Sequence, residues 1–247
     1  MRNFKRAVWI SVLVFSFALI GFVVKNGRDL SPEANIEKLE VTSKSDLSGS
    51  NFVDNAAVKQ KTAAAYGQLP INFEPNVGQA DDSVQFVARG RGYSMFLAGD
   101  EAKLSLRNDA GKYASLTMML DGASDNTVSR GLDERESRTN YLVGNDPEKW
   151  HTDVQNYGRV KFEQIYPGID IVYYGNGQKL EYDLVVSANA DPKSIALKFS
   201  GASSAKIDKV SGDLLLKTEV GTLRQLKPFA YQETDGVKQE VASAYRL

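Results

Sequence analysis

The chain has 247 residues, of which 42% are hydrophobic and 25% charged, a composition typical of globular proteins. It contains no cysteine, which excludes disulfide bonds, thiolate metal sites and a cysteine nucleophile. Residues 25–247 carry 27 basic and 31 acidic residues, a net charge of −4, because the first 24 residues hold three of the 30 basic residues and no acidic one. Nucleic-acid-binding proteins usually present a basic surface, so no nucleic-acid partner is expected.

Residues 1–24 have the form of an export signal. Three basic residues, Arg2, Lys5 and Arg6, precede an uncharged apolar run at residues 7–24. This run is also long enough for a membrane-spanning helix, which needs about 17–25 residues, and no small-x-small cleavage site follows it. A cleaved signal peptide and a signal-anchor helix therefore both stay open. In either case we expect the rest of the chain to be extracytoplasmic, secreted or anchored to the inner membrane, with membrane contact only through residues 7–24.

Residues 25–68 are predicted to be a flexible linker or stalk. The segment is rich in Ser, Asp, Asn, Lys and Glu, with single apolar residues scattered through it. Residues 56–66 favour a short helix that Gly67 and Pro70 would end.

Residues 69–247 are predicted to be all-β. Short alternating segments follow one another, separated by Gly, Asp, Asn and Pro, and no segment shows a sustained helical period. The predicted strands lie at residues 84–88, 93–97, 102–106, 114–120, 159–165, 166–186 (a hairpin), 195–199, 206–208, 213–216, 222–225, 229–232 and 237–245. One helical turn is expected at 146–150. This pattern indicates an antiparallel β-sandwich, as one domain or two small fused sandwiches. The last residues still read as a strand, so we expect a truncated domain or the N-terminal part of a longer protein.

The hairpin at residues 166–186 offers the best site candidate. With Asn176-Gly177 as its turn, Asp170 would lie directly opposite Asp183, with Glu181 on the same face. The core face would hold the alternate residues Ile169, Ile171, Tyr173, Leu180, Tyr182 and Leu184. Like charges opposite each other destabilise a sheet, so something should compensate them.

Three interpretations of these acids stay open. Asp170, Glu181 and Asp183 could bind calcium, a hard cation that prefers oxygen ligands. Two of them could be the carboxylate pair of a glycosidase. Alternatively, the acids form ion pairs with Lys161, Arg159 or Lys179 and have no chemical role. We favour this last interpretation, so no cofactor other than calcium is considered.

Two aromatic residues are candidate ligand-binding residues. Exposed aromatic faces on β-sandwiches can stack on sugar rings, and the predicted register leaves Tyr174 on the outer face. Trp150, next to the predicted helical turn, is the second candidate. The single histidine, His151, has no Gly-x-Ser-x-Gly partner motif, so we expect it to pack or cap rather than to catalyse.

Several separated motifs occur in one order along the chain. They are LPINFEPNVGQA (69–80), FVARGRGY (86–93), NYLVGNDPEKW (140–150), YPGIDIVYYG (166–175), LEYD (180–183) and QLKP (225–228). Together they resemble the N-terminal β-rich domain of unknown function that precedes SBBP β-propeller repeats in large bacterial surface proteins. The resemblance implies a secreted or surface, multidomain, non-enzymatic context and supplies no catalytic residues. No propeller repeats follow in this sequence.

Two functions follow from these observations. The first is a non-catalytic extracytoplasmic structural or interaction module that binds another domain or protein at the cell surface, or a glycan. The second is an extracellular polysaccharide hydrolase that uses carboxylates of the hairpin. We favour the module and do not expect an enzyme.

Overall fold

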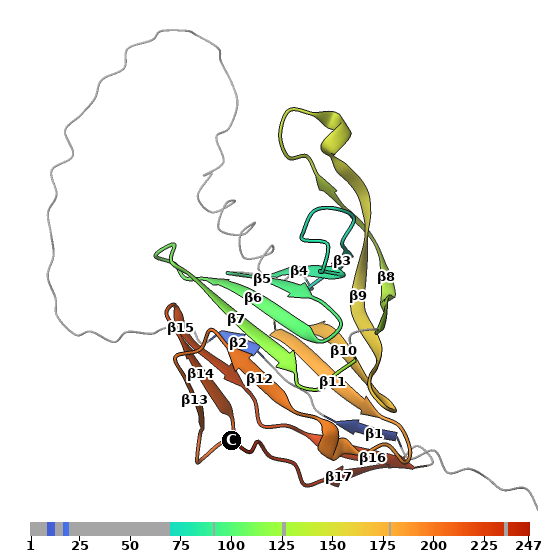
Figure 1. Cartoon of the computed structure of the whole chain (residues 1–247), viewed down its shortest axis with the longest axis vertical. Helices are drawn as coiled ribbons and strands as arrows, with labels where there is room; N and C mark the ends of the chain where they lie inside the picture. The colour runs from blue at the N-terminus through green and yellow to red at the C-terminus, as the bar shows by residue number, and fades with distance from the viewer. Residues whose placement is uncertain are drawn as a thin grey trace, which may run out of the picture. The chain divides into compact units, whose positions relative to one another are not determined.

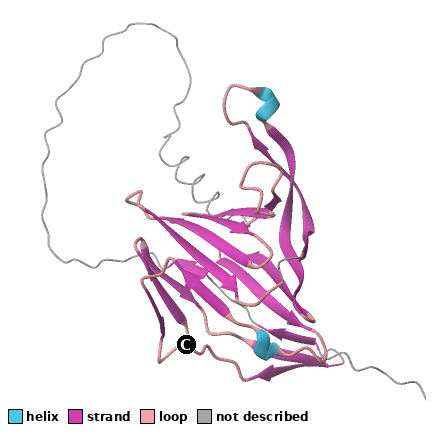
Figure 2. Ribbon diagram, in the orientation of Figure 1, coloured by secondary structure: helices cyan, strands magenta, loops and turns pink. Residues whose placement is uncertain are grey.

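The computed structural model describes residues 9–12, 17–19 and 70–247, apart from residues 91, 125–126, 178 and 235–236. The predicted linker and its short helix, residues 25–68, thus lie outside the described residues. The described part is almost entirely antiparallel β-structure with two short 3-10 turns (Figure 2). This confirms the all-β, sandwich-like fold class.

The elements follow one another in this order along the described chain. The first group is β1 (Trp9–Val12), β2 (Phe17–Leu19), β3 (Phe73–Pro75), β4 (Phe86–Gly90), β5 (Tyr93–Leu97), β6 (Glu101–Arg107), β7 (Tyr113–Leu120), β8 (Val128–Tyr141), η1 (Pro147–Lys149) and β9 (His151–Tyr166). The second group is β10 (Ile169–Asn176), β11 (Lys179–Val186), η2 (Pro192–Ser194), β12 (Leu197–Ser200), β13 (Ser204–Ile207), β14 (Leu214–Thr218), β15 (Gly221–Gln225), β16 (Ala230–Thr234) and β17 (Val237–Val241).

Two layers share the long strand β9. The first layer runs from β9 through β3, β4, β5, β6 and β7 to β12. The second runs from β9 through β10 to β11, whose other edge pairs with β1 and β2. From there β1 continues to β16 and β17, and β2 continues to β15, β14 and β13 (Figure 1). β9 serves both layers because different parts of one edge pair with β10 and with β3.

The core lies between these layers and contains alternate residues of their strands. The first layer contributes buried residues such as Leu104 and Met118, and the second contributes the predicted hairpin residues. Tyr173 and Tyr182 are almost inaccessible, with ring centroids 5.7 Å apart. Phe162 packs edge-on against Tyr173, with centroids 6.0 Å apart. Each such side chain contributes roughly 1.5–3 kcal/mol by its removal from water.

The hairpin β10–β11 has a different register from the predicted one. Asn176 pairs with Lys179, so the turn begins only after Asn176, with Gly177 in the left-handed region at φ 61°. The prediction of an Asn176-Gly177 turn was therefore wrong. The shift changes partners by two positions, and side chains alternate with a period of two, so the predicted core face is confirmed.

β8 and the first half of β9 form a long hairpin that sequence analysis did not predict as strands. Figure 1 shows this hairpin, which we call the arm, extending beyond the sandwich with η1 at its end. No residue of β8 is buried, so its sequence lacks the alternation that marks a half-buried strand. The helical turn predicted at 146–150 is present as η1, with the Asp146 carboxylate accepting from the Glu148 N–H at 3.1 Å.

The described parts of the apolar segment 7–24 are the two short strands β1 and β2, whereas the sequence predicts a helix there. Short apolar runs fit either structure by pattern alone, and here the open edge of β11 supplies strand partners. No helix among the described residues has the length and apolar character needed to cross a membrane. The export role of residues 1–24 stays a prediction.

Candidate functional site

The three acids of the hairpin are held separately by different neighbours. Asp170 lies opposite Val185, and its carboxylate is 2.8 Å from the Lys161 Nζ. The same carboxylate accepts the backbone N–H of Gln164 at 2.8 Å. The predicted opposition of Asp170 and Asp183 is therefore wrong, because the true register places Val172 opposite Asp183. The predicted ion pair between Asp170 and Lys161 is confirmed.

Asp183 is the most perturbed acid of this face. It accepts a hydrogen bond from the Tyr174 hydroxyl at 3.0 Å. Burial raises the pKa of its carboxyl to about 6, and the nearby charge of Glu181 adds to this rise. The Tyr174 hydrogen bond and the positive charges of Arg159 and Lys238 act in the opposite direction and lower the pKa. A group with such a pKa can exchange protons near neutral pH.

Glu181 lies opposite Tyr174 and is only 4% exposed. It accepts a hydrogen bond from the Asn176 side-chain amide at 3.2 Å. Burial and the two neighbouring carboxylates raise the pKa of the Tyr174 hydroxyl, so this tyrosine is a hydrogen-bond donor at neutral pH. Tyr174 thus lies between Asp183 and Glu181, whereas Asp170 is separate from them and pairs with Lys161.

These acids do not form a group with the arrangement of a metal site. Within the described ranges, no three His, Asp or Glu side chains lie close enough to hold a metal ion together. Asp81, an acid in the loop after β3, accepts the N–H and the hydroxyl of Ser83 at 3.0 Å and 2.7 Å. The calcium hypothesis for Asp170, Glu181 and Asp183 stays a hypothesis that needs a titration.

The two aromatic candidates lie far from each other. Tyr174 lies opposite Arg159 in the sandwich. Trp150 precedes Arg159 by nine residues in the chain and lies at the end of the arm. At about 3.3 Å per residue the separation is roughly 25–30 Å. Tyr174 is half-buried and bonded to Asp183, so Trp150 is the more accessible of the two, 36% exposed. One sugar cannot contact both.

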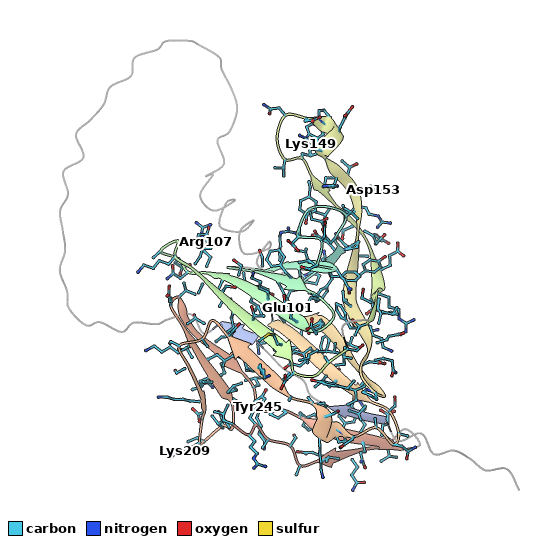
Figure 3. All side chains as sticks on the ribbon, in the orientation of Figure 1. Glu101, Arg107, Lys149, Asp153, Lys209 and Tyr245 are labelled. Carbon is cyan, nitrogen blue, oxygen red and sulfur yellow. The ribbon has the colours of Figure 1, made fainter. Side chains whose placement is uncertain are left out.

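Exposed apolar side chains gather at the end of the arm. Leu142 is 58% exposed and Val143 73% exposed, and both lie in the loop that also holds Trp150. The indole N–H of Trp150 donates to the Gly144 carbonyl at 3.3 Å and fixes the ring against this loop. Figure 3 shows Lys149 at this end and Asp153 further along the arm. We call Leu142, Val143 and Trp150 the arm-end patch; sequence reasoning found only its tryptophan.

A buried carboxylate anchors the arm to the sandwich. Glu74 on β3 is 7% exposed, and Arg89 on β4 donates to it at 3.0 Å. Tyr141 at the end of β8 also donates to Glu74, and the Arg89 guanidinium lies 5.0 Å from the centroid of the Tyr141 ring. Burial, with the hydrogen bond to Glu74, raises the pKa of Tyr141 to about 12. The hydroxyl of Thr139 lies 3.1 Å from the second Glu74 oxygen.

Sequence reasoning missed this anchor because its members come from three strands far apart in the chain. No local motif joins Glu74, Arg89 and Tyr141, and each looks like an ordinary surface residue in its own segment. The one available signal was an acid inside the short apolar segment that becomes β3.

Comparison with known proteins gives a single family. The model of a domain of unknown function, DUF7948, matches residues 73–247, which is more than half of the chain. The chain belongs to the DUF7948 family. No curated protein and no solved structure matches it.

The DUF7948 match includes every element of the sandwich from β3 onward, the arm and the hairpin acids. It begins at Phe73, the first residue of β3. The N-terminal segment that contains β1 and β2 lies outside the match.

Proposed function

We propose that the chain is a non-catalytic, extracytoplasmic interaction module of a bacterial surface or secreted protein, and that it contacts its partner through the arm-end patch. The observation that carries this proposal is the exposure of Leu142, Val143 and Trp150 together, at the end of a hairpin whose first strand, β8, buries no residue. Exposed apolar groups cost stability in water and commonly mark interaction sites. Tryptophan is also enriched among the residues that dominate binding energy.

The rest of the arm fits a presenting role. Thr139 and Tyr141, just before the loop that carries the patch, both contact Glu74, so the patch is displayed on a supported element rather than on a free loop. The basic flank and apolar run of residues 1–24 support export. We propose a protein or another domain at the cell surface as the partner, with a glycan stacked on Trp150 as the alternative ligand. The resemblance to domains that precede SBBP propellers is consistent with a multidomain surface context.

The second candidate is an extracellular polysaccharide hydrolase. It is favoured by the pKa of Asp183, about 6, which suits a general acid, and by the nearby carboxylate of Glu181. Opposing it, Asp183 accepts from Tyr174 and Glu181 accepts from Asn176, so neither carboxylate is free to meet a glycosidic bond without a rearrangement. Loss of polysaccharide hydrolysis in Asp183→Asn would support this candidate.

The module is tested by placing a photocrosslinking amino acid at Val143 of the full chain in the native bacterium. We expect one dominant adduct, reduced about tenfold or more by Trp150→Ala, since truncating a central tryptophan commonly costs 2 kcal/mol or more. The matched control is Val210→Ser, which changes another exposed valine, 98% accessible, in a different loop. Equal adduct yields from Trp150→Ala and Val210→Ser would overturn the proposal.

A further inference from the structure

In the second layer, β11 is separated from β15 and β16 by a gap one strand wide, which β1 and β2 occupy and which we call the slot. β11 pairs with β10 along all eight of its residues, from Lys179 to Val186, but its other edge pairs among the described residues only with β1 and β2. Beyond them lie β16 and β15, whose slot-facing edges likewise pair only with β1 and β2 in the described chain. Figure 1 shows β1 beside β16, between the second layer and the last strands.

β16 and β15, the two strands on the far side of the slot from β11, follow one register in their pairing with β1 and β2. Trp9 to Val12 pair with Glu233 to Ala230, and Phe17 to Leu19 pair with Gln225 to Leu223, and all seven pairs keep a single register. On the β11 side the register changes by only one residue, from Val12 opposite Leu184 to Phe17 opposite Leu180. The described residues therefore occupy the slot as two short strands, both antiparallel to β11, with a one-residue change of register between them.

A side-chain hydrogen bond joins the two sides of the slot without involving β1 or β2. Tyr182 of β11 accepts a hydrogen bond from the Gln225 side-chain amide of β15 at 2.8 Å. This contact joins the two walls directly, and both residues are fully buried. Two strands that flank a third are about 9.6 Å apart, a distance that these two long side chains span. The walls thus stay connected at strand-accepting width when the slot is empty.

The walls select an apolar occupant. Leu180, Leu184 and Val186 on β11, with Leu223 and Ala230 on the far walls, are all buried. The register sets Ile10, Val12 and Phe17 opposite these residues, whereas Ser11 and Ala18 take the alternate positions. An uncharged segment with large apolar residues at alternate positions in each half, and a one-residue shift between the halves, matches this pattern.

The segment that occupies the slot is the one whose sequence marks it for export. Insertion of residues 7–24 into a membrane, or their removal, is incompatible with β1 and β2 pairing to β11, since one segment cannot do both. Export would leave the open edges of β11, β15 and β16 as a template for another strand.

We infer that the exported protein is a strand acceptor, which binds an extended, uncharged, alternately apolar segment of a partner polypeptide between β11 and the collinear pair β15–β16. The inference rests on the export proposed above and is independent of the arm-end patch. Main-chain hydrogen bonds to both walls provide the affinity, and the buried wall residues provide the selectivity. The chain's own strands β1 and β2 show the chemistry of segments that fit.

The first experiment uses a peptide of residues 8–20 with a lysine tail, and the full chain with Ser11→Pro and Ala18→Pro. Proline removes the N–H groups that a strand needs, so the chain's own segment can no longer occupy the slot. We expect the peptide to bind this variant at least tenfold more tightly than the unmodified chain, and a peptide with Val12→Asp and Phe17→Asp not to bind. Equal binding to both proteins, or none, would overturn the inference.

The second experiment maps the site and separates the possible occupants. The natural sequence has no cysteine, so a peptide with Ser11→Cys should form a disulfide with Tyr231→Cys in the proline variant and not with the exposed control Val210→Cys. In the exported full chain with Ser11→Cys and Tyr231→Cys, an intrachain disulfide would show that the segment keeps the slot itself, which sinks the inference. Trp150→Ala should leave peptide binding unchanged, so failure of the slot and failure of the arm-end patch are distinguishable.

Discussion

The hairpin β10–β11 and the arm β8–β9 are both pairs of long antiparallel strands, yet they are stabilised in different ways. The hairpin buries one face in the core, where Ile171, Tyr173 and Leu184 are inaccessible. β8 buries no residue, and its end is held through polar contacts, in which Tyr141 and Thr139 bond to Glu74. A strand that is stabilised by burial cannot present its apolar groups to a partner, whereas one held by a polar anchor can.

The largest expected effect is in the hairpin core. Tyr173→Ala should lower the free energy of unfolding by about 3–5 kcal/mol, because it leaves a cavity between the layers. The matched control Tyr113→Ala, at a residue that is 62% exposed on β7, should change it by less than about 1 kcal/mol. Urea unfolding of both variants measures this difference. Similar losses in the two variants would contradict the assignment of the core.

The anchor of the arm should come next. Glu74→Gln removes the charge that Arg89 and Tyr141 bond, and we expect a loss of about 1–3 kcal/mol. In this variant, hydrogen exchange of the arm amides should become faster than in the natural protein, by more than that of the β10 and β11 amides. Glu134→Gln, in an exposed pair with Arg138 on the same arm, is the control and should change little. Uniform exchange changes across the whole sandwich would show that Glu74 is not a local anchor.

A smaller effect is expected on the outer face of the hairpin. The pKa of Asp183 is about 6 in the folded protein, above its ordinary value of 3.8, so the folded state binds more protons between about pH 4 and 6. Stability should therefore fall as the pH rises through this window. Asp183→Asn should remove this dependence and add about 1 kcal/mol at pH 7.5, a value reduced for solvent screening.

Thermal unfolding of both proteins from pH 4 to pH 8 measures the effect. A profile that rises with pH in the natural protein between pH 4 and 6, and is flattened by Asp183→Asn, would have the wrong sign and contradict the burial of this carboxylate.

The smallest effect should come from Asp170→Asn. Its ion pair with Lys161 is partly exposed, and the asparagine carbonyl can still accept the Gln164 N–H, so we expect a loss below about 1 kcal/mol. The same measurement with and without millimolar calcium tests the metal hypothesis. A calcium-dependent rise in melting temperature that disappears in Asp170→Asn would establish a calcium site and overturn the ion-pair interpretation.

Local patterns in the chain were enough to predict the antiparallel sandwich, the buried face of the hairpin and the capped turn at Pro147–Lys149. Each of these depends on neighbours within a few residues: the two-residue alternation of a half-buried strand, and an aspartate before a proline. The pairing of Asp170 with Lys161 was also within reach, because adjacent strands of one meander carry both residues.

Other features depend on contacts between distant parts of the chain, and no local pattern records them. The position of the hairpin turn follows from the pairing of whole strands, and two registers that differ by two residues have the same alternation. β8 lacked the alternation of a half-buried strand because none of its residues is buried. Glu74, Arg89 and Tyr141 come together only where β3, β4 and β8 meet, and burial rather than sequence sets the pKa of Asp183.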